Sequence, residues 1–298
     1  MKPKVSIFIP TKNAGSDFFE VLDSIYNQKE KDLEVIIVDS GSTDETLEIV
    51  RNFPIKLYEI KPTEFGHGKT RNLALKYSRA NYIVFLSQDA LPKDSYWLSN
   101  LLINFSNKKT AGIFSRQIPR EDAEETEKFF YKYYFPDQKK IRPNKKNNSI
   151  QNRFFSNVSS CIRKEILQKY KFNDSILTTE DQEWAKRITE LGFKTIYEPK
   201  SIVIHSHNHN LKQVFQGYFD SAFSINEITK KEFKSFRRKS FRFVSKEFKY
   251  ILTNKPLEIP FLILKNFIKV LGIFFGLNEK RLPLFLKRKL SMNKYYWD

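Results

Sequence analysis

The amino-terminal third of the chain alternates between short apolar runs and segments with the spacing of amphipathic helices. The apolar run at residues 5–9 predicts a buried strand, and three further strands are predicted at residues 33–38, 55–60 and 82–86. Helices are predicted between them, at residues 16–27 and 69–78. Strands that alternate with helices in this way form a mostly parallel sheet with helices on both faces. The predicted fold class is therefore α/β.

Polar residues follow three of the predicted strands. They are Thr11 and Asn13, next to Pro10, after the first strand, Asp39 after the second, and Gln88 and Asp89 after the fourth. Ligands of parallel α/β sheets bind beyond the carboxyl ends of the strands. We therefore expect these polar residues to lie along one edge of the sheet and to form a single site.

The segment 64–72 is a glycine-rich basic turn that leads into a predicted helix. Backbone N–H groups at a helix start bind anions, and Lys69 and Arg71 add positive charge. Asp89, at a strand end, can hold the metal that accompanies a phosphate. This combination indicates a nucleotide diphosphate site and hence an enzyme. Alternatively, Lys69 and Arg71 form a solvated helix face, and His67 only bonds backbone groups of the turn.

A second acidic cluster begins another predicted helix, at residues 179–184 (Thr-Glu-Asp-Gln-Glu-Trp). The apolar positions of this helix continue to Leu191, and Gly192 ends it. Acids in the first turn complement the helix dipole, and this effect alone would account for Glu180 and Asp181.

Together these motifs resemble those of the family 2 glycosyltransferases, which have the GT-A fold. The resemblance lies in residues 9–13 (Ile-Pro-Thr-Lys-Asn), 38–44 (Val-Asp-Ser-Gly-Ser-Thr-Asp) and 68–72 (Gly-Lys-Thr-Arg-Asn). The segments similar to the rhamnosyltransferase-like branch of the family are 65–72, 87–90, 281–283 and 291–297. In place of the usual paired acids the chain has Ser87-Gln88-Asp89, in which Asp89 is the only acid. The resemblance covers nearly the whole chain. It implies a Rossmann-like GT-A fold and inverting transfer of a sugar from a nucleotide-diphosphate donor.

The resemblance also implies roles for individual residues. The pattern Glu-Asp-x-Glu-Trp at 180–184 matches the motif that supplies the catalytic base, for which we expect Asp181, with Glu180 as second choice. Asp39 would accept the ring N–H of a pyrimidine base, although it could instead only cap the following turn. The residues expected to bind the nucleotide sugar are Pro10, Thr11, Asn13, Asp39, Gly68, Lys69, Arg71, Asn72, Gln88 and Asp89.

A divalent cation, Mg²⁺ or Mn²⁺, is implied at Asp89. Three histidines, His205, His207 and His209, follow an apolar strand predicted at 201–204. A histidine after this strand can approach the metal in the family, and we expect His207 first and His205 second. Two alternatives follow from the residues alone. One is a zinc site, which has no Cys or close acid to complete it, and the other is a strand end with hydrogen-bonded histidines.

The positive charge of the chain is unevenly distributed. The formal net charge is +18, and residues 230–298 hold 18 Lys and Arg against 5 Asp and Glu, a net of +13. Such charge requires an anionic partner, which could be nucleic acid, anionic lipid or a phosphorylated substrate. We expect a catalytic domain at 1–228 and a second functional region at 229–298. The single cysteine, Cys161, excludes an internal disulfide and is expected to be a small buried apolar residue.

The carboxyl-terminal region is expected to form basic amphipathic helices. Residues 233–248 mix Phe with Lys and Arg, and residues 260–277 are strongly apolar except for Lys265 and Lys269. These two lysines share a helix face, and they argue against a full membrane span. An apolar helix flanked by basic residues suits the plane of an anionic leaflet. The alternative is that these helices pack on the catalytic domain.

These patterns favour a glycosyltransferase that uses a deoxythymidine-diphosphate sugar such as dTDP-rhamnose. The acceptor would be a lipid-linked or surface polysaccharide intermediate, and the enzyme would be peripheral on the cytoplasmic face of the cell membrane. Transfer of another hexose from a UDP-sugar is the second possibility. A basic nucleic-acid-binding protein is disfavoured, because no binding motif interleaves aromatic and basic residues in the amino-terminal half. We therefore expect no nucleic-acid partner.

Overall fold

The computed structural model describes residues 2–143, 154–228 and 233–297, and the side chains of 226–240 lie outside the described part. The chain forms two compact units. The first, called the sheet unit, holds residues 1–118, 135–175 and 180–205. The second, called the helical unit, holds residues 119–134, 176–179 and 206–298. Each unit combines distant segments, so the two units do not meet at a single point of the chain. The predicted functional boundary after residue 228 therefore stays a prediction.

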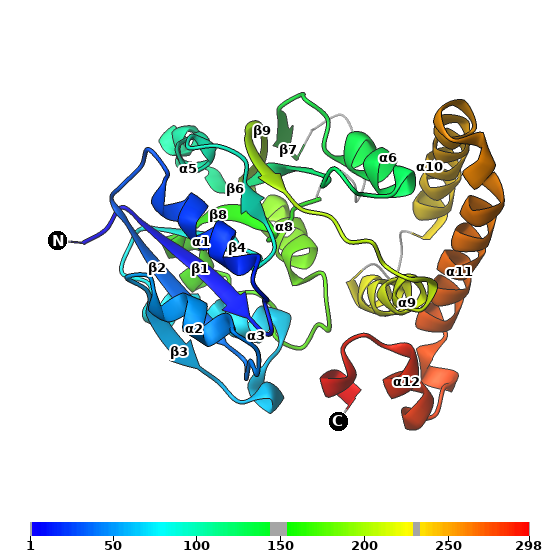
Figure 1. Ribbon diagram of the computed structural model, residues 1–298, viewed down its shortest axis with the longest axis horizontal. Helices are drawn as coiled ribbons and strands as arrows, with labels where there is room; N and C mark the ends of the chain where they lie inside the picture. The colour runs from blue at the N-terminus through cyan, green and yellow to red at the C-terminus, as the bar shows by residue number, and fades with distance from the viewer. Residues whose placement is uncertain (1, 144–153, 229–232, 298) are drawn as a thin grey trace. The chain divides into compact units, whose positions relative to one another are not determined.

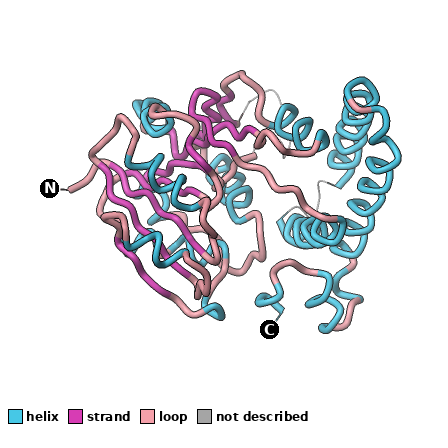
Figure 2. Tube along the Cα trace, in the orientation of Figure 1, coloured by secondary structure: helices cyan, strands magenta, loops and turns pink. Residues whose placement is uncertain are grey.

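The sheet unit is built on one mixed sheet, whose strands are magenta in Figure 2. Its parallel part consists of β3 (Lys56–Glu59), β2 (Leu33–Asp39), β1 (Val5–Thr11) and β4 (Tyr82–Leu86), in that spatial order. The sheet then continues through β8 (Ser159–Arg163), β6 (Thr110–Ile118), β9 (Lys194–Ile204) and β5 (Leu91–Pro92), and β7 (Lys140–Arg142) pairs with β9. Only β8 separates the parallel part from the parallel pair of β6 and β9, since it is antiparallel to β4 and to β6. All four predicted strands are present.

Helices cover both faces of this sheet (Figure 1). Side chains alternate along a strand, so neighbouring residues of β1 point to opposite faces. Ile7 shares a core cluster with Leu22 of α1 (Phe18–Tyr26) and Leu98 of α5 (Trp97–Leu102). On the opposite face, Phe8 contacts Phe85, and the aromatic contacts continue through Phe172 to Trp184 of α8 (Glu180–Glu190). The predicted α/β class is therefore confirmed.

Shorter helices complete the sheet unit. They are α2 (Thr46–Arg51), α3 (His67–Asn72), α4 (Ala74–Tyr77) and α7 (Lys164–Lys169), with 3-10 helices at Pro62–Glu64 and Ile103–Ser106. The single helix predicted over 69–78 is thus two helices. The turn tightens at Leu73, whose N–H bonds the carbonyl of Thr70, three residues earlier. The strand predicted at 201–204 is the end of β9. Cys161 is fully buried in β8, as expected, and this burial raises the pKa of its thiol.

The helical unit consists of α6 (Glu125–Tyr134), α9 (Leu211–Ile228), α10 (Phe233–Asn254), α11 (Ile259–Leu277) and α12 (Leu284–Leu290). Short 3-10 helices lie at Pro256–Glu258, Glu279–Arg281 and Lys294–Trp297. Phe219 and Phe223 of α9 pack against Trp297 near the end of the chain. The core of this unit therefore includes the carboxyl-terminal segment.

Helices α9 and α11 lie in very close contact. A Cβ atom added at Gly272 would come 2.6 Å from the carbonyl oxygen of Phe215, and one at Gly276 would come 2.4 Å from that of Phe219. Both distances are below any real carbon–oxygen contact and involve backbone atoms that cannot turn aside. Glycine is therefore required at both positions for α11 to lie along α9.

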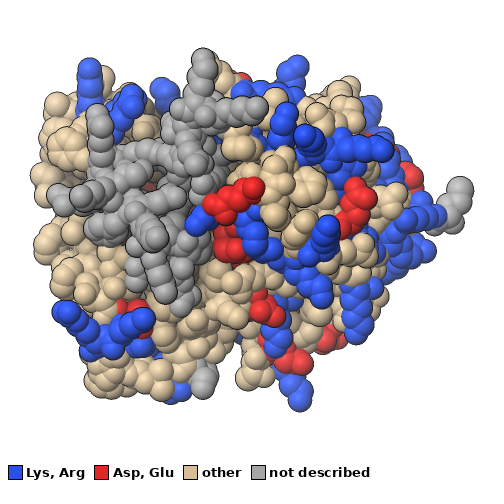
Figure 3. Space-filling view, turned by 180° about the vertical axis from the view of Figure 1, so that it is seen from behind, with Lys and Arg blue, Asp and Glu red and all other residues tan. Residues whose placement is uncertain are grey.

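The lysines of α11 share one face, as predicted, but that face points into the helical unit. Lys265 is buried and Lys269 is largely covered, so neither side chain is available to a lipid surface. The segment Pro256–Leu277 is, by length and composition only, sufficient to cross a membrane, and 22% of its most apolar stretch is buried. On the face of the molecule shown in Figure 3, Lys and Arg cover more of the surface than Asp and Glu do, in line with the net positive charge of the chain.

Candidate active site

The loops that follow β1, β2 and β4 are joined by side-chain hydrogen bonds. Oε1 of Gln88 accepts from the N–H of Lys12 at 2.8 Å, and Nε2 of Gln88 donates to the carbonyl of Lys12 at 3.1 Å. The N–H of Asn13 donates to Oγ of Ser42, and Oδ1 of Asn13 accepts from the N–H of Thr43, both at 2.8 Å. The polar clusters predicted to meet at one edge of the sheet therefore do meet.

Asp39 is fully buried at the end of β2, opposite Thr11, which follows Pro10 at the end of β1. Its Oδ1 accepts from the N–H groups of Gly41 and Ser42 at 2.9 and 2.8 Å. Its Oδ2 accepts from the hydroxyls of Thr11 and Ser42 at 3.0 and 2.5 Å. These bonds cap the turn, which is the simpler interpretation of Asp39. Contact with a base stays a prediction, and it requires one hydroxyl to rotate away.

Two of the predicted nucleotide-binding residues in α3 have packing contacts. A Cβ atom added at buried Gly68 would lie 2.4 Å from the carbonyl oxygen of Asn173. Nδ2 of Asn72 donates to the carbonyl of Phe172 at 3.0 Å, and Oδ1 accepts from the N–H of Phe172 at 3.1 Å. These contacts fix α3 against residues 172–173. Lys69, between them, is exposed and directed to solvent.

Arg71 joins the basic turn to the acidic cluster. Its Nη1 lies 2.9 Å from Oε1 of Glu180, and the two side chains are only 10% and 4% exposed. Nε of Arg71 is buried and has no hydrogen-bond partner within the described residues. Arg71 is therefore engaged with a carboxylate through Nη1 and keeps a covered Nε donor without a partner among the described residues.

Asn157, which the sequence did not single out, bonds both members of the acidic pair. Its N–H donates to Oδ2 of Asp181 at 2.9 Å, and its Nδ2 lies 3.3 Å from Oε1 of Glu180. Its own Oδ1 accepts from the hydroxyl of Ser160 at 2.8 Å, which fixes the amide orientation. Asn157 lies just before β8, and an isolated Asn before a strand carries no recognisable motif.

The two neighbouring carboxyls have opposite pKa shifts. Burial acts to raise the pKa of Glu180, but Arg71 and, to a smaller extent, His67 outweigh it and lower that pKa. Burial and then the negative charge of Glu180 raise the pKa of Asp181 to about 7. Asp181 keeps part of its surface open to solvent, although its carboxylate lies in dense surroundings. Two carboxyls with separated pKa values divide the roles of fixed charge and proton acceptor.

Asp89 and His205 form the candidate metal site within the sheet unit. Nε2 of buried His205 lies 3.5 Å from Oδ1 of Asp89, which is 34% exposed. A carboxylate oxygen and an imidazole nitrogen are donors that Mn²⁺ accepts, and Mg²⁺ accepts the carboxylate. These residues therefore fit a divalent cation. His207 is exposed and belongs to the helical unit, and its ring stacks on that of His209. Within the sheet unit, His205 is therefore the histidine next to Asp89.

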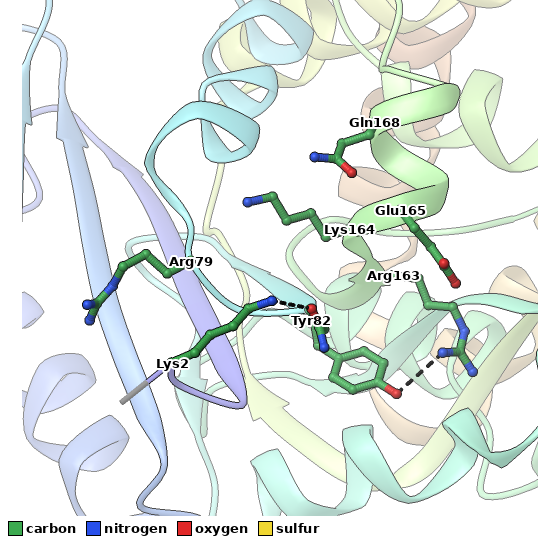
Figure 4. A pocket seen from close by; sticks show the side chains of 8 residues that line it. Lys2, Arg79, Tyr82, Arg163, Lys164, Glu165 and Gln168 are labelled. Atoms are coloured by element: carbon green, nitrogen blue, oxygen red, sulfur yellow. Dashed lines mark hydrogen bonds between the residues drawn. The ribbon is translucent and has the colours of Figure 1, made fainter.

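A pocket of about 440 Å³ lies at the opposite end of the same strands (Figure 4). Its basic lining residues already have internal partners. Nζ of Lys2 donates to Oδ1 of Asn81 at 2.7 Å, and Nη1 of Arg163 donates to the hydroxyl of Tyr82 at 3.3 Å. This pocket is separate from the carboxyl ends of the strands, and we assign it no part in the candidate site.

Sequence comparison places this chain in a known family. The model of the family described as "Glycosyl transferase family 2" matches residues 6–171. The O-antigen chain rhamnosyltransferase RfbN of Salmonella typhimurium is 33% identical over 302 residues, which cover 99% of this chain and 96% of the relative. The O-antigen chain rhamnosyltransferase WbaN of Salmonella anatum is 32% identical, with the same coverage of both chains.

Solved structures share the fold. The mannosyltransferase PcManGT from Pyrobaculum calidifontis, in complex with GDP-Man and Mn²⁺, has a TM-score of 0.57 and 19% identity, covering 93% of this chain and 73% of its own. Staphylococcus aureus TarS, residues 1–349 in complex with UDP-GlcNAc, has a TM-score of 0.55 and 16% identity, covering 93% and 91%. This likeness supports the predicted GT-A fold. Because the family model spans more than half of the chain and two relatives align over nearly all of it, this chain belongs to glycosyl transferase family 2 and is a glycosyltransferase.

Proposed function

We propose that this enzyme is an inverting rhamnosyltransferase that moves rhamnose from dTDP-rhamnose to a hydroxyl of a lipid-linked or surface polysaccharide. The names of RfbN and WbaN, both O-antigen chain rhamnosyltransferases, support the sugar and the class of acceptor. Such an acceptor would place the enzyme at the cytoplasmic face of the cell membrane, as a peripheral protein.

The observation that carries the chemical proposal is the separation of the pKa values of Glu180 and Asp181. Glu180 stays ionised beside Arg71 and supplies a fixed negative charge. Burial and then this charge raise the pKa of Asp181 to about 7, and a pKa close to neutral pH suits a general base. We therefore assign the base to Asp181 and a positioning role to Glu180.

In the proposed reaction, Asp181 accepts the proton of the acceptor hydroxyl. The acceptor oxygen forms a bond to the anomeric carbon of the donor sugar as the bond from that carbon to the diphosphate oxygen breaks. The electron pair of the broken bond leaves with the nucleoside diphosphate. Attack on the face opposite the leaving group inverts the anomeric configuration, and a single carboxylate base is sufficient for it.

Basic residues of the α3 region would stabilise the leaving group. Lys69 is exposed and free to turn toward a diphosphate, and Arg71 has a buried donor without a partner among the described residues. At the other end of the donor, Pro10, Thr11, Asn13 and Asp39 would hold the base. An indirect role is proposed for Gly68, Asn72 and Gln88. Their contacts would hold the backbone of α3 and of the loop at Lys12 in position for the donor.

Asp89 and His205 would hold Mg²⁺ or Mn²⁺, with His207, two residues along the chain, as an additional ligand. When bound, the cation would neutralise charge that develops on the departing diphosphate. The structural relative PcManGT was solved with Mn²⁺, which supports this choice of metal. Asp89 and His205 follow β4 and β9, and the loops that would bind the base lie at the same edge of the sheet.

Transfer of a hexose from a UDP-sugar is the second candidate. Thymine and uracil both present a ring N–H, so the carboxylate of Asp39 would accept either base. Purified enzyme should therefore be offered radiolabelled dTDP-rhamnose and UDP-hexoses in turn, with a membrane extract as the source of acceptor and Asp181→Asn as the inactive control. Incorporation of label from dTDP-rhamnose alone is expected. Incorporation only from a UDP-hexose would replace rhamnose in the proposal, and no incorporation from any donor would contradict it.

A further inference from the structure

Helix α11 exposes an apolar stripe along its outer face. Ile263, Phe267, Val270 and Phe274 are spaced by three or four residues and therefore lie on one side of the helix. Their side chains are 58%, 57%, 61% and 58% exposed. Soluble proteins rarely leave a continuous row of large apolar side chains in water. We call these four residues the outer stripe.

The polar residues of α11 lie on the inner face instead. Nζ of Lys265 lies 2.6 Å from Oε2 of Glu124 and 3.0 Å from the hydroxyl of Thr126. Nζ of Lys269 lies 3.3 Å from Oε1 of Glu247, whose side chain is 1% exposed. The polarity of this helix is thus the reverse of that of an ordinary surface helix, and its charges are satisfied within the helical unit.

The exposed charged residues of the carboxyl-terminal segment that carries the outer stripe are of one sign. Within described residues 241–297, Glu247 and Glu279 are buried and Glu258 is half-buried, so no acidic side chain there is exposed. The exposed charged residues of that range are Arg242, Lys246, Lys249, Lys255, Lys280, Arg281, Arg288, Lys289 and Lys294. An apolar row with a cationic surround complements a surface that is apolar inside and anionic outside.

We propose that the helical unit docks on an anionic lipid bilayer through the outer stripe of α11, with this helix lying in the plane of the interface. The stripe would enter the boundary between headgroups and acyl chains, and the exposed Lys and Arg would contact lipid phosphates. This proposal depends on the membrane location that the proposed function gives the enzyme. It does not depend on the identity of the donor or the acceptor, or on the chemistry of transfer.

The packing of α11 favours the interface plane over a membrane crossing. Gly272 and Gly276 hold α11 along α9, and the ion pairs of Lys265 and Lys269 tie its inner face to the rest of the unit. A crossing helix would have to give up these contacts and leave two lysines in the hydrocarbon region, which is costly. The outer stripe can enter the interface with all of these contacts in place.

A second copy of the chain fits the stripe less well than lipid does. Two copies placed stripe to stripe would bring two cationic surrounds together, with no exposed acid on residues 241–297 of either copy to offset the repulsion. Anionic headgroups offer opposite charge to the same residues. Lipid is therefore the occupant that both the apolar row and its surround favour.

The experiment is co-sedimentation of the full-length protein with vesicles of phosphatidylcholine alone or mixed with phosphatidylglycerol, in the absence of donor. The double variant Phe267→Gln/Phe274→Gln should bind mixed vesicles at least about tenfold more weakly than the unaltered protein, since each Phe loses its burial in lipid. The matched control is Phe19→Gln, which removes an exposed phenylalanine, 49% accessible, from the sheet unit and should bind as the unaltered protein does.

A second pair of variants separates charge from insertion. Lys280→Gln/Arg281→Gln should lower binding to mixed vesicles by a few fold, with little effect on pure phosphatidylcholine, because anionic lipid attracts each basic residue near the surface. Equal binding of the unaltered protein and the double-Phe variant to mixed vesicles would overturn the proposal. A change from dimer to monomer in that variant, with vesicle binding intact, would assign the stripe to a second copy instead.

Transfer of sugar to a water-soluble acceptor distinguishes this proposal from the proposed function. The double-Phe variant should keep that activity, because its substitutions change none of the residues assigned to the candidate active site. Deletion of residues after about 233 is a poorer test, since it removes Phe275 and Trp297 from the core of the helical unit. The circular dichroism spectrum and melting temperature of each point variant would show that its fold is kept.

Discussion

Nη1 of Arg71 lies 2.9 Å from Oε1 of Glu180, in an ion pair that is almost completely removed from solvent. This pair joins α3, in the basic turn, to the first residue of α8. It keeps Glu180 ionised, and burial together with that negative charge raises the pKa of the next carboxyl, Asp181. The pair therefore has both a structural and a chemical consequence, and these can be measured separately.

Arg71→Met should reduce the free energy of unfolding by about 3–5 kcal/mol, because it leaves the buried carboxylate of Glu180 without its cation. The double variant Arg71→Met/Glu180→Gln should recover most of this loss. Urea unfolding of the two single variants and the double variant would measure the coupling. The control is Arg79→Met, whose guanidinium pairs with Glu34 but is 58% exposed, and which should cost less than about 1 kcal/mol. Equal losses at Arg71 and Arg79 would contradict a strongly coupled buried pair.

Asp181→Asn should keep donor binding and lower the rate of transfer by about 10²–10⁴-fold, because it preserves the shape of the side chain and removes its proton-accepting power. Single-turnover transfer and equilibrium binding of the labelled donor would be compared in the same preparation. Glu180→Gln should keep more activity than Asp181→Asn. Nearly unaltered transfer in a folded Asp181→Asn variant would show that the base lies elsewhere, with Glu180 as the next candidate.

The rate of transfer should rise with pH through about 7, since only the ionised form of Asp181 accepts a proton and its pKa is raised to that value. The contribution of Asp181 to the free energy of unfolding changes with pH in the opposite direction to the rate. A folded pKa above the ordinary value of 3.8 means that the folded protein binds the extra proton between those two values, so this group stabilises the fold less as pH rises from about 4 to 7.

Asp181→Asn removes this titration. The difference in melting temperature, variant minus unaltered protein, should therefore increase between pH 5 and pH 8. This comparison reports the pKa of Asp181 without any use of activity. A constant difference across that range would indicate an ordinary aspartate, and the assignment of the base would lose its main support.

Asp89→Ala and His205→Ala should each weaken binding of Mn²⁺ by about tenfold or more, because each removes one ligand of the proposed site. Electron paramagnetic resonance of free Mn²⁺ measures this binding without turnover. His207→Ala provides the comparison that ranks the two histidines. Chelation should also lower transfer by the unaltered enzyme. Full turnover in excess chelator would show that Lys69 and Arg71 stabilise the leaving group without a metal.

The fold was predictable from local patterns in the parallel part of the sheet. Apolar runs identify β1, β2 and β4 because strands covered on both faces need apolar residues at successive positions. The edge of the sheet that carries the candidate site was predicted from the general position of ligands in parallel sheets. The bonds between Gln88 and Lys12 confirm that the loops after β4 and β1 meet there. Periodicity alone did not reveal the break at Leu73, which follows Asn72, a residue bonded to Phe172 one hundred positions along the chain.

The remaining features depend on contacts between distant segments. Arg71 and Glu180 are separated by 109 positions, and Lys265 and Glu124 by 141. Helical spacing shows that Lys265 and Lys269 share a face, but it does not reveal which side of an otherwise apolar helix is covered. Asn157 could not be identified because its importance comes from the two carboxylates that it bonds, and not from its neighbours in sequence.

The burial of Cys161 in β8 has a practical consequence. A thiol that is fully covered, and whose pKa burial raises, does not react with maleimide reagents while the protein is folded. A cysteine introduced at one outer position of α11 would then be the single reactive site in the native chain. An environment-sensitive fluorophore at that position would record immersion depth one residue at a time, and the natural cysteine could stay in place.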